Sequence, residues 1–265
     1  MKVRIRDVID TLKTPAIDRE KTVDQLLYGD PDTEVKQIAV TFLASARVIE
    51  EAKKLGVNLI ISHEGIYYSH FDRSEMLKSD PVYLSKHKLI EDSGIAIFRN
   101  HDHVHLQGYD GITRALVASL GWLDYELESS FVSSVLALDK AMPLKEVISH
   151  IKKKLGLAYV RYTGDLETSC RRIGVLVGYR GSGENVIPLV AGKELDLVIY
   201  GEGPEWESPE YIKDAIMLGM GKALIVLGHA ESEIPGMEQM AKKLQQLYPE
   251  IPVHFIRDEE IFKLM

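Results

Sequence analysis

The chain has 265 residues, 45% of them hydrophobic, and its 40 acidic residues outnumber its 32 basic ones, giving a net charge of -8. A chain of this length can bury a core without disulfides, and its single cysteine, Cys170, cannot form an intramolecular one. The acidic balance disfavours nucleic acid as a partner, because nonspecific binding to phosphates needs a positive surface. We interpret the basic runs 152–154 and 171–172 as solvated faces, and Cys170 as structural.

The first residues alternate charged and apolar side chains and contain no long apolar core, unlike a signal peptide. No stretch approaches about 18 uninterrupted apolar residues, so the sequence predicts no membrane-spanning helix. A single cysteine also suits a reducing compartment. We therefore expect a cytoplasmic protein with no membrane partner.

Helices and strands are predicted to alternate along the first part of the chain. In order, they are helix 3–12, strand 35–41, helix 45–55, strand 58–62, helix 81–93, strand 95–99 and helix 110–120. Gly56, Gly94 and Gly121 follow three of these helices, which is typical of helix C-termini. Strands of nearly continuous apolar residues that alternate with helices favour a largely parallel sheet covered on both faces.

Similar α/β material follows from about Tyr125. In order, it comprises strand 131–138, helix 144–155, strands 159–162 and 172–177, loop 178–183, helix 185–192, strand 195–200, helix 209–218, strand 224–227, helix 237–247 and strand 253–255. We expect an α/β protein of two lobes, 1–125 and 126–236, with 237–265 returning to the first. Each lobe would have a largely parallel or mixed sheet covered by helices, and the cleft between lobes is the expected ligand site.

Three predicted strands run into a histidine. Each of these histidines has a second ligand-capable side chain close behind it, and the pairs are His63 with Glu64, His101 with His105, and His229 with Glu233. Because open α/β sheets build their sites at the carboxyl ends of strands, the three pairs suggest convergence on one metal site. The four-residue spacing of the third pair would place both side chains on one face of a helical turn.

The run His101, His103 and His105 is compatible with two local structures. On a strand all three side chains share a face, whereas on a helical turn His101 and His105 do. The run is partly similar to the His-x-His-x-Asp-His motif of metallo-β-lactamase-like hydrolases, but the closing Asp-His pair is missing. His103 is a candidate for a group that supports a ligand, or for a proton shuttle.

Other segments have interpretations with and without a ligand. Of His63 and Glu64, one could face solvent and the other could cap a helix, and Glu233 could be a first-turn carboxylate at a helix N-terminus. The segment 181–183 could bind an anion at a helix N-terminus or form a tight strand-to-helix turn. Glu202 could support a metal ligand or belong to a plain loop.

The order of these segments resembles the NIF-three-like family of dinuclear-metal-centre proteins, often named GTP cyclohydrolase type 2 homologues. The resemblance covers nearly the whole chain. It rests on residues 38–45, 59–64, 101–105, 178–183, 200–202 and 228–236, the last segment being the most specific. It implies that the metal ligands are His63, Glu64, His101, His105, His229 and Glu233.

The chain departs from the family pattern at two places. The family commonly has two histidines followed by proline, whereas here Glu64 and Gly65 take the later positions. It commonly has an aspartate where this chain has His105. The two changes nearly exchange ligand types, which preserves the number of ligands and their total charge.

The resemblance also implies a homohexameric ring with metal pairs in a central cavity. Mixed nitrogen and oxygen ligands suit two divalent Zn, Mn or Fe ions better than Ca. Two such ions outweigh the two carboxylates in charge, which favours a small anionic substrate. The leading hypothesis is a metal-dependent hydrolase acting on a nucleotide or another phosphorylated small molecule. The alternatives are a non-catalytic metal-binding ring or scaffold and, disfavoured by charge, a nucleic-acid-associated factor.

Overall fold

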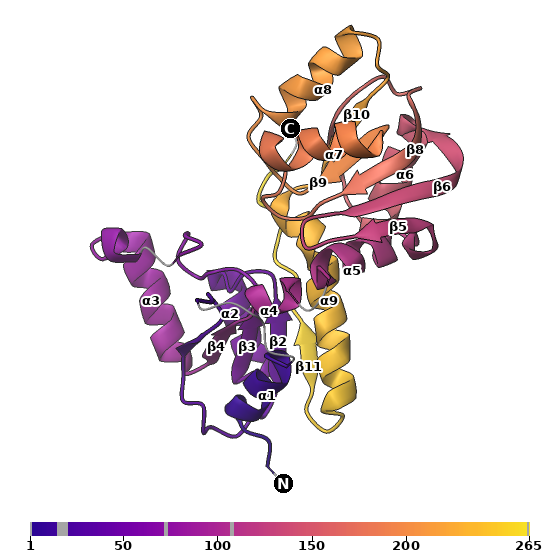
Figure 1. Ribbon diagram of the computed structural model, residues 1–265. Helices are drawn as coiled ribbons and strands as arrows, with labels where there is room; N and C mark the ends of the chain where they lie inside the picture. The colour runs from indigo at the N-terminus through magenta and orange to yellow at the C-terminus, as the bar shows by residue number, and fades with distance from the viewer. Residues whose placement is uncertain (1, 15–20, 72–73, 107–108, 264) are drawn as a thin grey trace. The chain divides into compact units, whose positions relative to one another are not determined.

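The computed structural model describes residues 2–14, 21–71, 74–106, 109–263 and 265. Contacts divide the chain into two units, Met1–Gln107 with Met237–Met265, and Gly108–Gly236. Each unit has its own mixed sheet and its own helices (Figure 1), so the predicted architecture of two α/β lobes is confirmed. This division includes α5 (Gly111–Ser119) in the second unit, whereas the boundary expected near residue 125 lies after it. The assignment of separate domains stays a prediction.

The sheet of the first unit has five strands in the order β1-β4-β3-β2-β11. Their bounds are β1 (Leu26–Tyr28), β2 (Ile38–Thr41), β3 (Leu59–Ser62), β4 (Ala96–Arg99) and β11 (Val253–Phe255). The strands β11, β2, β3 and β4 pair in parallel, and β1 pairs antiparallel with β4. Every residue of β2, β3 and β4 is buried, as their continuous apolar sequences predict.

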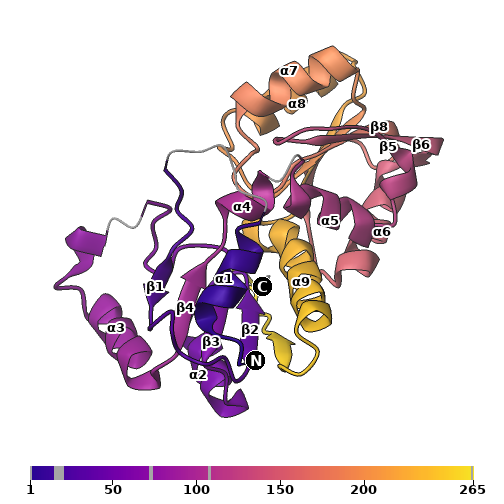
Figure 2. The ribbon, with the colours of Figure 1, turned by 60° about the horizontal axis from the view of Figure 1, so that its bottom comes forward.

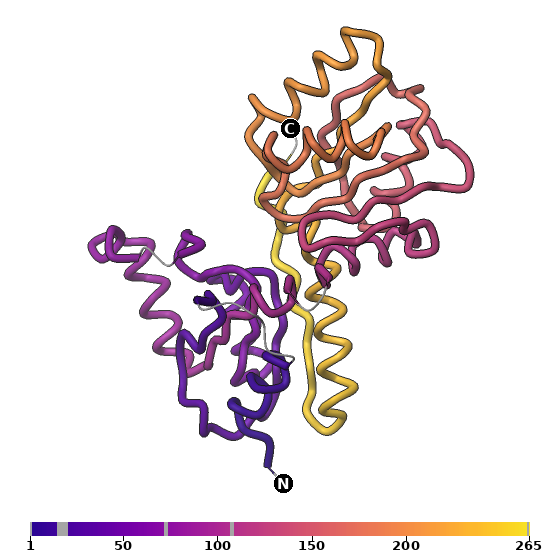
Figure 3. Tube along the Cα trace, viewed as in Figure 1, coloured from indigo at the N-terminus to yellow at the C-terminus, as the bar shows by residue number. Residues whose placement is uncertain are grey.

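Helices cover both faces of this sheet. They are α1 (Ile5–Leu12), α2 (Ala46–Leu55) and α3 (Pro81–Ser93), with a short 3-10 turn η1 (Ser74–Leu77) before α3. On one face, Val48 of α2 belongs to the same core as Ile60 and Ile97 of the sheet. On the other, the ammonium of Lys13, just after α1, lies 5.6 Å from the centroid of the Phe98 ring. Figure 2 shows α1 across the strands, and Figure 3 lets the path from β2 to β4 be followed.

The sheet of the second unit has six strands in the order β5-β6-β8-β9-β10-β7. Their bounds are β5 (Glu126–Ser129), β6 (Ser134–Pro143), β7 (Arg161–Thr163), β8 (Ser169–Val175), β9 (Leu197–Tyr200) and β10 (Ala223–Val226). The strands β8, β9 and β10 pair in parallel, and the other pairings are antiparallel. The helices are α5, α6 (Leu144–Leu155), α7 (Gly183–Lys193) and α8 (Ser208–Met217), with a 3-10 turn η2 (Leu123–Tyr125). Figure 2 shows α7 and α8 on one face and α5 and α6 on the other.

The last helix begins earlier than the sequence predicts. The expected helix 237–247 is the later part of α9 (His229–Leu247), which continues through Pro235 and Gly236. A proline inside a helix removes one backbone hydrogen bond and usually signals a boundary. The helix nevertheless continues and packs closely there, since a Cβ on Gly236 would lie 2.4 Å from Cδ1 of Ile112 in α5. Across the described ranges, no helix combines the length and apolar character that crossing a membrane requires.

Candidate metal centre

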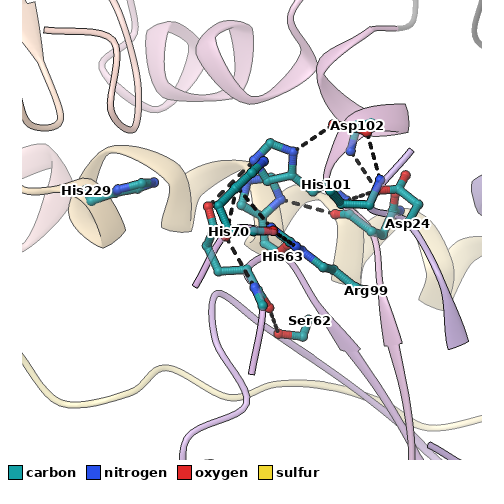
Figure 4. Close-up of polar contacts among 12 residues, drawn as sticks. Asp24, Ser62, His63, His70, Arg99, His101, Asp102 and His229 are labelled. Atoms are coloured by element: carbon teal, nitrogen blue, oxygen red, sulfur yellow. Dashed lines mark hydrogen bonds and ion pairs between the residues drawn. The ribbon is translucent and has the colours of Figure 1, made fainter. Parts of the chain in front are cut away.

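In the first unit, two of the three predicted histidines meet at the carboxyl ends of two neighbouring strands. The strands β3 and β4 are parallel neighbours with Ser62 opposite Arg99, so the residues that follow both strands emerge side by side. The rings of His63 and His101 stack with their centroids 4.6 Å apart (Figure 4). The buried Ser62 hydroxyl holds the corner after β3 by donating to the Glu64 carbonyl at 2.9 Å.

The helical turn α4 (Asp102–His105) brings His105 to the same place. The helical interpretation of the run 101–105 is therefore confirmed, and the strand alternative is wrong. The Nε2 atoms of His63 and His105 lie 3.3 Å apart. Two nitrogens on one tetrahedral zinc, each about 2.0–2.1 Å from the metal, are about 3.4 Å apart. Together with His101, these residues offer three ligand atoms within 4.8 Å of one another.

Two of the rings are held by contacts at Nδ1. The Nδ1 of His63 lies 3.1 Å from the Asn100 carbonyl, and that of His101 lies 3.1 Å from Oδ1 of Asp102 (Figure 4). A histidine that donates from Nδ1 keeps its Nε2 lone pair for a metal, and such contacts are usual behind metal ligands. Burial lowers the pKa of His101 to about 4, so this ring is neutral and able to bind a metal at pH 7.

Asp24, which the sequence did not indicate, anchors α4. Its carboxylate accepts from the backbone N–H groups of His101 and Asp102, both at 2.7 Å, and of His103 at 2.9 Å. It also contacts Nδ1 of His103 at 2.6 Å, so His103 lies against Asp24. Because Asp24 precedes α4 by some eighty residues of chain and belongs to no motif, local spacing carries no signal for it.

Arg99 is the second residue that sequence reasoning missed. Its guanidinium, in a residue only 2% exposed, donates to the carbonyls of His63 and His70 at 3.3 and 2.6 Å. It also donates to Oε2 of Glu64 at 2.8 Å, while Oε1 of Glu64 lies 3.6 Å from Nε2 of His101. The basic side chain in an otherwise apolar strand was the available signal.

Glu64 is ionised in this setting. Burial by itself raises the pKa of Glu64, but the contact with His70, the Arg99 charge and the charges that His63 and His101 carry when protonated at low pH outweigh burial and lower it to about 2. The structure also brings in His70, since one ligand atom each from Glu64, His70 and His101 lie within 4.8 Å of one another. His63, Glu64, His70, His101 and His105 are together called the first-unit cluster below.

In the second unit, His229 and Glu233 form the second-unit pair at the start of α9, one turn apart. The Nε2 of His229 lies 3.3 Å from Oε2 of the buried Glu233, as the four-residue spacing predicts. Its Nδ1 lies 3.0 Å from Oε1 of Glu202. This hydrogen bond lowers the pKa of Glu202. Glu202 therefore supports the ring of His229, which was one of its two expected interpretations.

Glycines make room for the second-unit pair. A Cβ on Gly178, whose φ is +55°, would lie 2.3 Å from Oε1 of Glu233 and 3.1 Å from Nε2 of His229. The Ser232 hydroxyl accepts from the Gly178 N–H at 2.9 Å and donates to the His229 carbonyl at 2.7 Å. The loop after β8 is thus shaped by close approach of its backbone to these side chains.

The anion-binding alternative for 181–183 is not favoured by the contacts of α7. The N–H of Gly183 at its start already donates to a protein carboxylate, Oε2 of Glu207, at 2.7 Å. The Gly181 N–H donates to the Glu202 carbonyl at 3.0 Å. The tight-turn interpretation therefore accounts for this segment.

Comparison with known proteins identifies one family. The family model described as Duf34/NIF3 (NGG1p interacting factor 3) matches residues 3–260. A Clostridium perfringens protein named GTP cyclohydrolase 1 type 2 homolog is 24% identical over 255 residues, which cover 92% of each chain. A protein of the same name from Clostridium acetobutylicum is 25% identical over 256 residues, covering 92% of this chain and 91% of the relative.

Solved structures share the fold. A Bacillus cereus protein related to NIF3 superposes over 100% of both chains with a TM-score of 0.79 and 14% identity. A hypothetical protein from Staphylococcus aureus does so over 100% of both chains with a TM-score of 0.76 and 19% identity. At these identities the likeness establishes the fold alone.

Proposed function

Because the chain belongs to the Duf34/NIF3 family, we propose that it binds two divalent metal ions and uses them to hydrolyse a nucleotide or another phosphorylated small molecule. The observation that carries the proposal is the pair of Nε2 atoms of His63 and His105, 3.3 Å apart in a buried setting. Their separation matches two ligands of one tetrahedral ion. The histidine and glutamate groups can hold a metal, and the number of ions and the chemistry are the proposed part.

The proposed ligands are those expected from the sequence: His63, Glu64, His101, His105, His229 and Glu233. We propose that the first-unit cluster and the second-unit pair both serve metal binding. Support comes from a shared arrangement, because His63, His101 and His229 each have an acceptor at Nδ1 and so direct Nε2 elsewhere. The contact of His103 with Asp24 favours a supporting role for His103 over a ligand role.

Imidazole and carboxylate donors suit Zn, Mn or Fe. When bound, paired ions lower the pKa of a bound water and stabilise the attacking and leaving oxygens of a displacement. Two divalent ions carry more positive charge than their ligands neutralise, because Glu64 and Glu233 are the only carboxylates among the six. Such a site attracts an anion, which supports a phosphorylated substrate. We further propose a cytoplasmic homohexamer, following the family resemblance.

A second candidate function is a non-catalytic metal-binding ring or scaffold. The burial of the first-unit cluster favours it, because His63 is fully buried and His105 is only 5% exposed. Buried ligands retain an ion well but leave little room for a substrate within the first unit.

One experiment separates the two functions. Metal-loaded wild-type protein is assayed on a panel of phosphoesters and nucleotides beside His229→Ala and the control His254→Ala, whose ring in β11 contacts Gln37 just before β2. Hydrolysis requires turnover in the wild type and the control and its loss in His229→Ala. Bound metal without turnover in any protein supports the scaffold. Turnover that persists in His229→Ala contradicts the proposed site.

A further inference from the structure

His70, which neither the sequence pattern nor the family resemblance marks, lies at the first-unit cluster. Its Nδ1 is 3.6 Å from Oε2 of Glu64, and its ring meets that of His101 edge-on with centroids 4.7 Å apart. Figure 4 shows its side chain beside those of His63 and His101. At 38% side-chain exposure it is the most accessible residue of its group, since the Glu64 and His101 side chains are 14% and 17% exposed.

The backbone of His70 is fixed. Nη1 of the buried Arg99 donates to the His70 carbonyl at 2.6 Å, and Nε of Arg99 donates to the carbonyl of His63. One guanidinium thus ties the loop after β3 to the strand end from which His101 follows. This anchor holds the backbone of His70 beside the first-unit cluster.

Two groups of ligand atoms share one histidine. His101 belongs both to the group with His63 and His105 and to the group with Glu64 and His70. Its Nε2 has one lone pair and can bind one ion, because Nδ1 contacts Asp102. His63 and His105 already form a matched pair at 3.3 Å, which leaves His101 for the second group.

The distances in the second group suit an ion as well. The separations of Oε2 of Glu64 from Nδ1 of His70, and of Oε1 of Glu64 from Nε2 of His101, are both 3.6 Å. Each carboxylate oxygen of Glu64 thus faces one imidazole, so Glu64 would bind an ion between His70 and His101 through both oxygens.

We propose that His70 is a metal ligand that holds one of the two ions together with Glu64 and His101, while His63 and His105 hold the other. This inference rests on the proposed metal-binding function and deepens it. His70 supplies an imidazole near Glu64, the position where the chain departs from the consecutive histidines of the family it resembles.

The two positions should differ in affinity. Nη2 of Arg99 donates to Oε2 of Glu64 at 2.8 Å and lies 3.1 Å from Nδ1 of His70. An ion at His70 must take over the lone pair of Nδ1 and must bind beside a fixed positive charge. The Glu64–His70–His101 position is therefore the weaker of the two.

The test is titration of the full-length, metal-free protein with Co²⁺, followed by visible absorption and by metal analysis after desalting. Wild type should bind two ions in two steps. His70→Ala should keep the tighter step and weaken the other by about 100-fold or more, since loss of a group that merely supports a ligand already costs about 10- to 100-fold. The control His254→Ala should match the wild type.

A cysteine at this position gives a positive signal. His70→Cys should restore the second step and add a thiolate-to-cobalt charge-transfer band in the near ultraviolet, which His254→Cys should lack. If His70→Ala binds both ions as tightly as the wild type and His70→Cys shows no band, His70 is not a ligand and the proposed function stands. If the wild type binds no transition metal, the proposed function itself fails.

Discussion

The first-unit cluster and the second-unit pair share acceptors at Nδ1 of their histidines but differ in what positions the surrounding backbone. The first-unit cluster depends on charged side chains from distant parts of the chain, with Asp24 under α4 and Arg99 joining two loops. The second-unit pair depends on backbone that comes close, where Gly178 leaves room for Glu233. The first arrangement should be sensitive to loss of charge and to pH, and the second to added volume.

Among changes that should affect the first-unit cluster and not the second-unit pair, Arg99→Met is expected to cause the largest loss of stability. It leaves the Glu64 carboxylate and two loop carbonyls without their buried donor, and breaking a buried ion pair costs about 3–5 kcal/mol. The matched control is Arg47→Met, whose partner Asp258 is more exposed and whose loss should cost less than about 1 kcal/mol. Urea unfolding measures both free energies, and equal losses would show that Arg99 does not organise the cluster.

Acidification should affect the metal-free first-unit cluster. The folded pKa of His101 is about 4, below the ordinary 6.5, so its contribution to stability is complete above pH 6.5 and is lost as pH falls toward 4. Glu64, lowered from 4.5 to about 2, acts in the same direction at lower pH. The loss from His101 alone amounts to about 3 kcal/mol. The free energy of unfolding, measured at pH 7, 5.5 and 4, should show this loss. In His101→Gln this free energy should vary less over the same pH range. An unchanged pH dependence in His101→Gln would contradict the assignment.

Added volume should instead break the second-unit pair. Gly178→Ala introduces a Cβ 2.3 Å from Oε1 of Glu233 at a left-handed φ of +55°, and we expect a loss of about 2–3 kcal/mol. Gly192→Ala in α7 is the control, because a Cβ there meets nothing within 4 Å, and it should stabilise by about 0.5–1 kcal/mol. If the two variants were equally stable, a side chain at position 178 would be tolerated beside Glu233.

The smallest effects concern the carboxylates behind the rings. Asp102→Asn and Glu202→Gln should each weaken Co²⁺ binding by about 10- to 100-fold, because each removes a charged acceptor from Nδ1 of a proposed ligand. Asp102 should have the larger effect, since its side chain is 2% exposed and that of Glu202 is 46% exposed. Titration with Co²⁺ ranks the two variants by affinity. If Glu202→Gln had the larger effect, burial of the carboxylate would not determine how strongly it supports metal binding.

Local sequence signals predicted much of the fold. The helices at Pro81–Ser93 and Leu144–Leu155 have the expected bounds, and each is closed by a glycine. Apolar runs located β3 and β4, and hence the residues that follow them. The short, partly exposed β1 and the solvent-facing β5 lack such runs and were not predicted.

The supporting residues of the site could not be found this way. Asp24, His70 and Arg99 act through contacts that join segments far apart in the sequence, and neither His70 nor Asp24 belongs to a periodic element. Their roles arise from tertiary packing, which a local pattern does not encode. The start of α9 was also missed, since Pro235 signals a boundary locally although the helix continues through it and Gly236 packs on Ile112.

The anchoring of α4 by Asp24 has a consequence for the order of folding. Asp24 immediately precedes Gln25, whose carbonyl accepts from the Arg99 N–H at 2.9 Å as β1 joins the sheet edge. Contacts between segments this far apart require closure of a long loop, and such contacts form late. The histidines of α4 are therefore expected to reach their final orientation when the edge strand docks. In kinetic terms, a newly made chain would acquire its affinity for metal at the end of folding.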